Sequence, residues 1–399
     1  MDKIEELLTR GVDKVYPSKE VLQQVLQSGK KLTIYQGFDP TGTQLHIGHM
    51  VGLRKLAQWQ KLGHHVIFLI GDATAVVGDP TGKTTARKVL TREEVLVNAE
   101  SYKEQASKIL SFQGENSVEI KFNGDWLNKM SAADFMHLAS LVSYNQIIER
   151  DMFQQRLKNN ESIGVLELIY PLLQGYDSVA MDVDVELGGS DQMFNMMMGR
   201  ELMQKIKGKE KFIMTTPLLT DSQGRKIGKT EGNVIALTDK PEELFGKIMA
   251  LPDDIVLKGF EYLTDAPMQR LSEIELALNN GENPINYKKQ LAYDIVKQLN
   301  SEDAAKKAQE AFESVVQHKD LPTEIPQFIL PFDKRLTTYA DLLVTTGLAE
   351  SKSEAKRLIE QGGVEIDNEK IIEPNKETTI EANAVIKVGK RKFVEVIVE

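Results

Sequence analysis

Two short apolar runs near the start of the chain, 32–35 and 66–70, each lead into a glycine. Runs of this length, rich in Val, Ile, Tyr and Phe, are typical of buried strands. Between them, Met50, Leu53 and Leu56 recur at the spacing of one helix face. A strand, a helix and a second strand in this order favour a parallel pair. The pattern therefore predicts an α/β domain with a Rossmann-like open parallel sheet.

The middle of the chain is less regular. Residues 92–165 have mostly helical patterns, with a strand-like piece at 117–122, so we expect a helical insertion between two halves of the sheet. A stretch at 180–187 alternates apolar and acidic residues before Gly188 and Gly189, which predicts another strand and a turn. Open parallel sheets bind ligands beyond the carboxyl ends of their strands, so residues after such turns are candidate binding residues.

Helical patterns continue through 241–316, and three prolines between 322 and 331 then favour an extended connector. An amphipathic segment at 353–361 and several strand-like pieces follow. The expected parts are a Rossmann-like domain at 1–238 with an insertion near 92–165, an α-helical domain at 239–320, a linker at 321–335 and a small α+β module at 336–399.

Composition narrows the class of protein. Apolar residues make up 41% and charged residues 27%, which is ordinary for a globular chain. A net charge of −10 argues against coating nucleic acid by bulk electrostatics, and the lack of cysteine excludes disulfides, thiolate zinc sites and a cysteine nucleophile. The apolar runs are far shorter than the roughly 20 residues of a membrane helix, and the N-terminus lacks the apolar core of a signal peptide. We therefore expect a cytoplasmic protein without membrane contact.

The sequence His-Ile-Gly-His at 46–49 falls at the expected start of the first helix. The first amides of a helix lack partners and its dipole is positive there, so an anion fits. His46 and His49 project from one side of that turn and can donate hydrogen bonds to phosphate, while Gly48 lets a base or ribose approach the backbone. For an isolated motif of this kind, two solvated histidines are the commoner explanation. A metal pair is poorly supported because no third ligand stands nearby.

A second basic motif, Lys-Ile-Gly-Lys-Thr at 226–230, lies between glycines in a polar stretch, which predicts a loop. Lys226 and Lys229 could clamp a pyrophosphate, although alone they form merely a basic loop. The segment 78–84 resembles a P-loop, but it has three residues where that motif needs four, and its proline removes an amide donor. A P-loop NTPase is therefore disfavoured, although Lys83 could still contact phosphate.

Polar residues recur on one face of a further expected helix. Tyr170, Gln174 and Asp177 stand four and three residues apart. Such groups can be solvated or capped, or they can form the wall of a binding pocket.

Taken in order, these segments resemble the bacterial tyrosyl-tRNA synthetases, a family of class I aminoacyl-tRNA synthetases. The resemblance spans nearly the whole chain and rests on blocks at 35–49, 78–87, 170–177, 188–192 and 226–230, together with a C-terminal module similar to a ribosomal-protein-like RNA-binding domain. It implies an enzyme that activates L-tyrosine with ATP, giving tyrosyl-adenylate and pyrophosphate. The enzyme then transfers tyrosine to the terminal ribose of tRNA(Tyr).

The resemblance also implies roles for single residues. The catalytic residues at the triphosphate are His46, His49, Lys226, Lys229, Thr41, Lys83 and Arg87. Further contacts to ATP are expected from Asp39, Gly48, Gly189, Asp191, Lys229 and Thr230. Mg²⁺ is expected on the phosphates, with no metal bound by the protein itself. The tyrosine contacts are Tyr35, Asp79, Tyr170, Gln174, Asp177 and Gln192, with Tyr35 and Asp177 at the phenol hydroxyl.

The C-terminal module is not a basic arm, because from residue 333 onward it has 11 Lys or Arg against 13 Asp or Glu. Lys352, Lys356 and Arg357 fall near one helix face and are the RNA-binding residues that the resemblance supports. A solvated helix face is the commoner explanation of such a pattern. The family also implies that the α-helical domain at 239–320 binds the anticodon. It implies a homodimer too, for which we expect the apolar-rich stretch 138–165 to form the interface.

Two alternatives stay open. A tryptophan-specific relative of the same fold is the nearest one, and Asp177, Tyr35 and the extra C-terminal module favour tyrosine over it. A non-catalytic RNA-binding protein that retains the fold is the other, and the intact histidine and lysine motifs argue against it.

Overall fold

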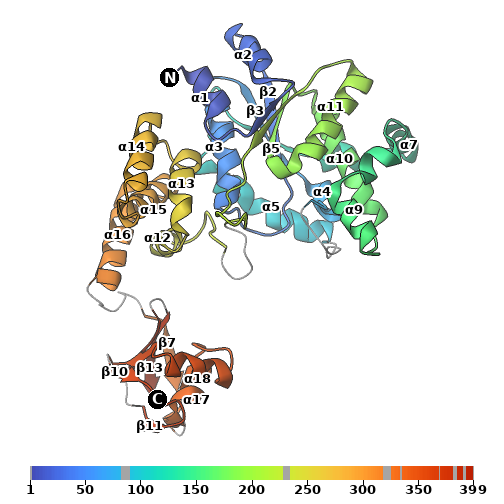
Figure 1. The fold of residues 1–399 in the computed structure, drawn as a ribbon. Coiled ribbons are helices and arrows are strands. Elements are labelled where there is room, and N and C mark those ends of the chain that lie inside the picture. The colour runs from blue at the N-terminus through green and yellow to red at the C-terminus, as the bar shows by residue number, and fades with distance from the viewer. Residues whose placement is uncertain are drawn as a thin grey trace. The chain divides into compact units, whose positions relative to one another are not determined.

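The computed structural model describes residues 2–81, 90–227, 234–317, 325–332, 335–367, 369–380, 384–389 and 392–398. It divides into two compact units, 1–308 and 309–399, which we describe separately (Figure 1). In the described part of the chain, no helix is both long enough and apolar enough to span a membrane.

A six-stranded sheet in the order β1-β6-β5-β2-β3-β4 forms the centre of the first unit. Its strands are β1 (Lys14–Tyr16), β2 (Thr33–Phe38), β3 (His65–Ile70), β4 (Glu119–Phe122), β5 (Val185–Gly189) and β6 (Phe212–Thr216). Only the β1–β6 pair is antiparallel. The expected parallel sheet is confirmed, and its strand order reverses direction between β2 and β5, the position where such sheets bind ligands.

Helices cover this sheet and connect its strands. They include α1 (Lys3–Thr9), α2 (Lys19–Gln27), α3 (Ile47–Lys61), α4 (Asp72–Val77), α5 (Arg92–Ser107), α10 (Val165–Met181) and α11 (Met193–Lys207). The apolar residues of β3 are almost wholly buried, as in strands with both faces covered. α3 contacts β2 and β3, and α11 contacts β5 and β6.

The structure differs from the sequence-based expectation at two boundaries. β4 pairs in parallel with β3 as the edge strand, so residues 119–122 belong to the sheet and not to a helical insertion at 92–165. The extra helices follow it, namely α6 (Gly124–Leu127), α7 (Ala132–Ser140), α8 (Tyr144–Ile148) and α9 (Asp151–Lys158). The strand expected at 180–187 starts only at Val185, because α10 continues to Met181 and ends at Asp182, which has a left-handed backbone conformation.

The all-helical segment expected after residue 239 is present. It comprises α12 (Pro241–Met249), α13 (Val256–Leu263), α14 (Met268–Asn279), α15 (Ile285–Leu299) and α16 (Glu302–Gln317). Ser301 caps α16, since its Oγ accepts a hydrogen bond from the Ala304 amide at 3.1 Å.

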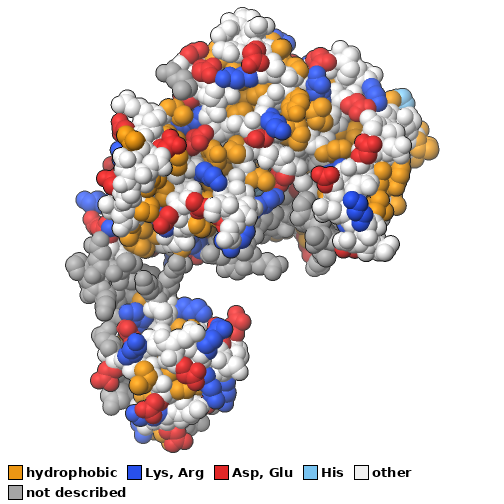
Figure 2. All heavy atoms as spheres, viewed as in Figure 1, with side chains coloured by type: hydrophobic (Ala, Val, Ile, Leu, Met, Phe, Trp, Pro, Cys, Tyr) orange, Lys and Arg blue, Asp and Glu red, His pale blue; other side chains and the backbone are white. Residues whose placement is uncertain are grey.

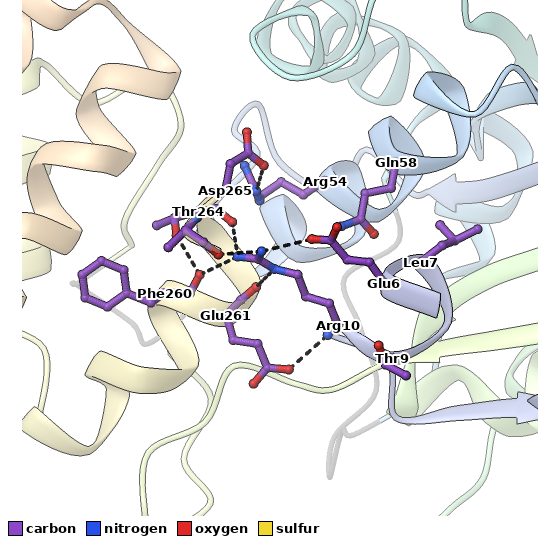
Figure 3. Close-up of polar contacts among 12 residues, drawn as sticks. Glu6, Leu7, Thr9, Arg10, Arg54, Gln58, Phe260, Glu261, Thr264 and Asp265 are labelled. Carbon is purple, nitrogen blue, oxygen red and sulfur yellow. Dashed lines mark hydrogen bonds and ion pairs between the residues drawn. The ribbon is translucent and has the colours of Figure 1, made fainter. Parts of the chain in front are cut away.

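A buried arginine joins α1 to this helical segment (Figure 3). Arg10 is 4% exposed, and its guanidinium donates hydrogen bonds of 2.6–3.2 Å to the carbonyl oxygens of Phe260, Glu261, Thr264 and Ala266. Carbonyls at a helix end lack helical partners, so Arg10 completes the end of α13. Lys55 of α3 donates in turn to the carbonyls of Leu7 and Arg10. α3 is thereby fixed to the helical segment through α1.

The second unit is a small α+β module, as expected. A five-stranded sheet contains β7 (Gln327–Leu330), β9 (Val364–Ile366), β10 (Glu369–Ile371), β12 (Ala384–Val388) and β13 (Lys392–Val398). A separate pair consists of β8 (Leu336–Thr338) and β11 (Glu377–Thr379), and the helices are α17 (Tyr339–Thr345) and α18 (Lys352–Glu360). β7 pairs in parallel with β13, so residues 327–330 belong to this module and not to the linker expected at 321–335.

Candidate active site

A cavity of about 300 Å³ lies at the carboxyl edge of the six-stranded sheet. The ends of β2, β3, β5 and β6 contribute Phe38, Gly71, Gly189 and Thr216 to its wall. It is also lined by the candidate residues Tyr35, Asp39, Thr41, His46, Gly48, His49, Asp79, Tyr170, Gln174, Asp177, Asp191, Gln192 and Lys226. The other candidates of this unit lie outside the described residues, namely Lys83, Arg87, Lys229 and Thr230.

The two histidines form the start of α3. His46 is the N-cap residue, and its Nδ1 accepts a hydrogen bond from the Gly48 amide at 3.1 Å. His49 Nδ1 accepts one from the His46 amide at 3.1 Å, and the two rings stack with their centroids 3.8 Å apart. A neutral imidazole that accepts at Nδ1 carries its hydrogen on Nε2. The cap therefore sets both rings with Nε2 as the donor atom.

The first amides of α3 do not have the role expected from the sequence. Ile47 N donates to the Ile235 carbonyl at 3.0 Å, Gly48 N to the His46 ring, and His49 N to the His46 carbonyl at 2.8 Å. Because these amides have partners within the protein, hydrogen bonds to an anion fall to the imidazoles, although the positive end of the helix dipole remains. A Cβ at Gly48 would lie 2.9 Å from His46 Cε1, so the glycine makes room for this cap.

Lys226 brings the second motif into the same cavity. Its Nζ lies 2.7 Å from Asp191 Oδ2, directly after β5. The amide of Ile227 donates a hydrogen bond to the Leu219 carbonyl at 2.8 Å. The carbonyl of Ile235 accepts one from the amide of Ile47, the first residue of α3, at 3.0 Å. The described residues on both sides of 228–233 are thus anchored at the cavity.

The inner end of the cavity presents a buried acid and a buried phenol. Asp177 is 2% exposed, and its two oxygens accept hydrogen bonds from Trp126 Nε1 at 2.8 Å and Asn123 Nδ2 at 3.2 Å. Burial raises the pKa of Asp177 well above its usual range, while these donors oppose the shift. The Tyr35 hydroxyl lies 2.9 Å from Ser178 Oγ, and burial raises the pKa of Tyr35, so this hydroxyl keeps its hydrogen.

Two further carboxylates, Asp39 and Asp79, also line the cavity. Asp79 Oδ2 accepts a hydrogen bond from Gln192 Nε2 at 2.7 Å. Asp39 accepts from the Tyr170 hydroxyl at 2.8 Å and from Thr74 Oγ1 at 2.7 Å. Burial is the main cause that raises the pKa of Tyr170. Carboxylates held in place by neutral donors suit a cationic group such as an α-ammonium.

Comparison with known proteins identifies the family. The protein-family model described as "tRNA synthetases class I (W and Y)" matches residues 27–317. The chain belongs to this family. A second model, "Tyrosine–tRNA ligase SYY-like C-terminal domain", matches residues 317–396, so it begins before the module expected at 336.

The curated relatives of this class I synthetase match over nearly its full length. The tyrosine–tRNA ligase of Thermotoga maritima is 43% identical over 390 residues, which are 97% of this chain and 96% of that one. The tyrosine–tRNA ligase of Colwellia psychrerythraea is 41% identical over 392 residues, 98% of this chain and 97% of that one.

Solved structures of the same family share its fold. A C-terminally truncated mitochondrial tyrosyl-tRNA synthetase from Aspergillus nidulans has a TM-score of 0.67 at 25% identity and covers 79% of this chain and 93% of that one. The Archaeoglobus fulgidus tyrosyl-tRNA synthetase complexed with L-tyrosine has a TM-score of 0.60 at 22% identity, covering 77% and 100%.

Several polar residues in or behind the wall of this synthetase's cavity were not predicted from the sequence. Trp126 and Asn123, which hold Asp177, come from α6 and the residue before it, and no motif marks them. Ser178, Glu186 and Lys211 lie behind Tyr35 and are almost fully buried. The alternation at 180–187 predicted a strand, but nothing in it marks Glu186 as buried.

The C-terminal candidates share one helix of the second unit. Lys352 and Arg357 are exposed on α18 and Lys356 is half-buried. Lys352 Nζ lies 2.5 Å from Asp341 Oδ1, so part of the positive charge is paired. On the face shown in Figure 2, basic and acidic side chains are interspersed over this module, in agreement with its sequence composition.

Proposed function

We propose that this chain activates L-tyrosine with ATP and transfers it to tRNA(Tyr). One observation carries the proposal. A single cavity holds the buried Asp177 and Tyr35 at its inner end, together with His46, His49 and Lys226. Its size suits an amino acid and a nucleotide phosphate chain side by side. The family and its tyrosine-specific relatives support the same activity.

The chemistry needs no covalent intermediate on the protein. The tyrosine carboxylate attacks the α-phosphorus of ATP in line, and pyrophosphate leaves. The Nε2–H groups of His46 and His49 and the ammonium of Lys226 stabilise the charge that develops on the phosphates. In our proposal Thr41 of the cavity wall joins them, and Lys83, Arg87, Lys229 and Thr230 add donors.

Mg²⁺ would accompany the phosphates. Among the described residues, no group of three or more His, Cys, Asp or Glu side chains could hold a metal. Mg²⁺ commonly binds through substrate phosphates and one or two carboxylates, for which Asp191 in the cavity wall is suitable. The cation would neutralise negative charge on the phosphates of ATP. His46, His49 and Lys226 would orient the same phosphates.

The identity of the amino acid rests on the inner end of the cavity. A phenol hydroxyl can donate one hydrogen bond and accept another, whereas an indole N–H can only donate. Tyr35 and Asp177 offer both kinds of partner in a place closed to water. This pair therefore favours tyrosine over tryptophan.

ATP–pyrophosphate exchange, measured separately with tyrosine, tryptophan and phenylalanine, tests the proposal. We expect exchange with tyrosine to exceed that with either competitor, and charging of tRNA(Tyr) to follow. Preferential exchange with tryptophan would instead support the tryptophan-specific alternative. RNA binding without any exchange would support a non-catalytic role.

We also propose that the protein is a homodimer built through residues 138–165. Tyr144, Leu157 and Val165 are 61%, 47% and 71% exposed in the single chain, and Figure 2 shows hydrophobic side chains gathered at the nearby edge formed by α7. A patch of exposed apolar side chains is typical of a protein–protein interface. Sedimentation of the full chain should give a dimer, and Val165→Asp should shift it toward a monomer. A monomeric wild type would contradict this proposal.

The C-terminal module is the proposed second contact for tRNA, through Lys352, Lys356 and Arg357 on α18. Replacing Lys352 and Arg357 by Ala should raise the KM for tRNA and leave pyrophosphate exchange unchanged, because exchange needs no tRNA.

The curated relatives above are bacterial tyrosine–tRNA ligases, and we propose the cytoplasm as the place of action.

A further inference from the structure

One face of α5 carries four polar side chains that all bond to the chain segment 40–45, which leads from β2 to α3. They stand at the spacing of a single helix face and are Asn98, Ser101, Tyr102 and Gln105. Segment 40–45 follows Asp39, contains Thr41 and leads into His46, and all three of these residues line the cavity. The chemistry described above gives α5 no role.

Segment 40–45 depends on α5 for many of its hydrogen bonds, because it belongs to no helix or strand. Asn98 Nδ2 donates to the Pro40 carbonyl at 3.0 Å. The hydroxyl of Tyr102, a residue that is 3% exposed, donates to the Gly42 carbonyl at 2.9 Å. Side chains of α5 therefore set the course of this backbone.

Gln105 makes the most hydrogen bonds of this set. It is 2% exposed, and its Oε1 accepts from the Leu45 amide at 2.7 Å. Its Nε2 donates to the Thr43 carbonyl at 2.8 Å and to Ser101 Oγ at 2.9 Å. A backbone amide only donates and a carbonyl only accepts, so these partners fix the orientation of the Gln105 amide. Gln105 thus bridges the two peptide groups on either side of residue 44.

Leu45 carries this restraint to the first histidine. Its side chain is fully buried, its amide is held by Gln105, and its carbonyl accepts from the Leu237 amide at 2.9 Å. The next residue is His46, the N-cap of α3, whose ring conformation sets Nε2 as a donor. A shift of Leu45 would therefore move His46.

The end of α5 also holds the chain that follows the second basic motif. Lys108, the C-cap residue of α5, donates from Nζ to the Leu237 carbonyl at 2.7 Å. Segment 235–237 pairs with the start of α3 through a bridge between Ala236 and His46. One helix thus contacts the backbone on both sides of the His46 cap.

We propose that α5 positions the ATP phosphate site, with Gln105 as the residue that fixes the place of His46. This inference rests on the proposed function, since it assigns the phosphates of ATP to His46. Gln105 does not line the cavity, so it acts through Leu45 and is a positioning residue. Small displacements of a group that meets the transition state lower the reaction rate strongly.

Gln105→Met in the full chain is the first test, because it keeps the length of the side chain and removes the amide. The rate of adenylate formation, measured per active site at saturating ATP and tyrosine, should fall about tenfold, as for the loss of one hydrogen bond. The dissociation constant of tyrosine should stay within about twofold, since Tyr35 and Asp177 belong to other elements. A merely structural role would lower the melting temperature and the number of active sites but leave the rate per site unchanged, and that result would overturn the proposal.

Two serines of α5 provide a matched pair of variants. Ser101 Oγ donates to the Thr43 carbonyl at 2.7 Å, whereas Ser107 Oγ donates to the Glu104 carbonyl within α5 itself at 2.6 Å. Ser101→Ala should lower the rate of adenylate formation about threefold, and Ser107→Ala should leave it unchanged. Equal effects of the two variants would contradict the proposal.

A double-mutant cycle with His46→Ala tests whether Gln105 acts through His46. Once the imidazole is gone, Gln105 has no ring to place, so Gln105→Met should lower the rate less than about threefold in the His46→Ala background. A tenfold loss in both backgrounds would show that Gln105 does not act through His46.

The outcomes separate this inference from the proposed function. If the wild-type protein shows no ATP–pyrophosphate exchange with tyrosine, the proposed function fails. If the wild-type protein catalyses this exchange but Gln105→Met keeps the wild-type rate per active site, only the positioning role of α5 fails.

Discussion

At the scale of single residues, Lys226 is the described lysine that we propose to contact the phosphates. Its ammonium is held by Asp191 at the cavity wall, and among the described residues it makes no hydrogen bond or ion pair with Tyr35 or Asp177. Lys226→Ala should therefore lower the rate of adenylate formation by about 10²-fold, the usual effect of removing one group that stabilises charge in a transition state. The dissociation constant of tyrosine, measured by equilibrium dialysis, should stay within about twofold. Equal losses of tyrosine binding and of rate would contradict a phosphate-specific role.

At the scale of elements, the turn between α3 and β3 contains a histidine that favours folding only when neutral. His64 is 6% exposed, and its Nδ1 accepts from the Leu32 amide at 3.2 Å beside β2. Burial, with a smaller effect of Lys31, lowers the pKa of His64 to about 4. In the unfolded chain, His64 has a pKa of about 6.5, so as pH falls this histidine binds a proton in the unfolded chain before it does so in the folded protein. The stability from His64 is therefore complete above about pH 6.5 and is lost progressively toward pH 4.

This prediction can be measured by urea unfolding at several pH values. Between pH 6.5 and pH 4, the titration of His64 should lower the free energy of unfolding by on the order of 3 kcal/mol. His64→Asn keeps an acceptor near the Leu32 amide but does not titrate, so its stability should fall less steeply over the same range. Parallel pH profiles for the two proteins would show that His64 does not carry this dependence.

The elements also show how far the sequence could predict the structure. β2 and β3 were predicted from the runs at 32–35 and 66–70, although only β3 is a continuous apolar run, as in strands buried on both faces. β4 was assigned to an insertion because its four half-buried residues give no such run, and β7 was assigned to a linker because it follows prolines. The cavity residues were found through motifs, whereas Glu186 and Lys211 belong to residue types that are rarely buried, and only the fold brings them together.

At the scale of the whole first unit, Arg10 connects the part that holds the cavity to the helical segment expected to meet the anticodon (Figure 3). Arg10→Met would leave several carbonyls around the end of α13 without their donor, which should destabilise the protein by about 3 kcal/mol. Pyrophosphate exchange depends on the cavity alone and should stay within about threefold of wild type. The KM for tRNA should rise more, because the helical segment loses its fixed attachment to α1. Glu6→Gln, which removes only a partly exposed ion pair of Arg10, is the matched control and should have little effect on either measurement. Exchange that falls as far as tRNA charging would show that Arg10 supports the whole unit and not its connection to the helical segment.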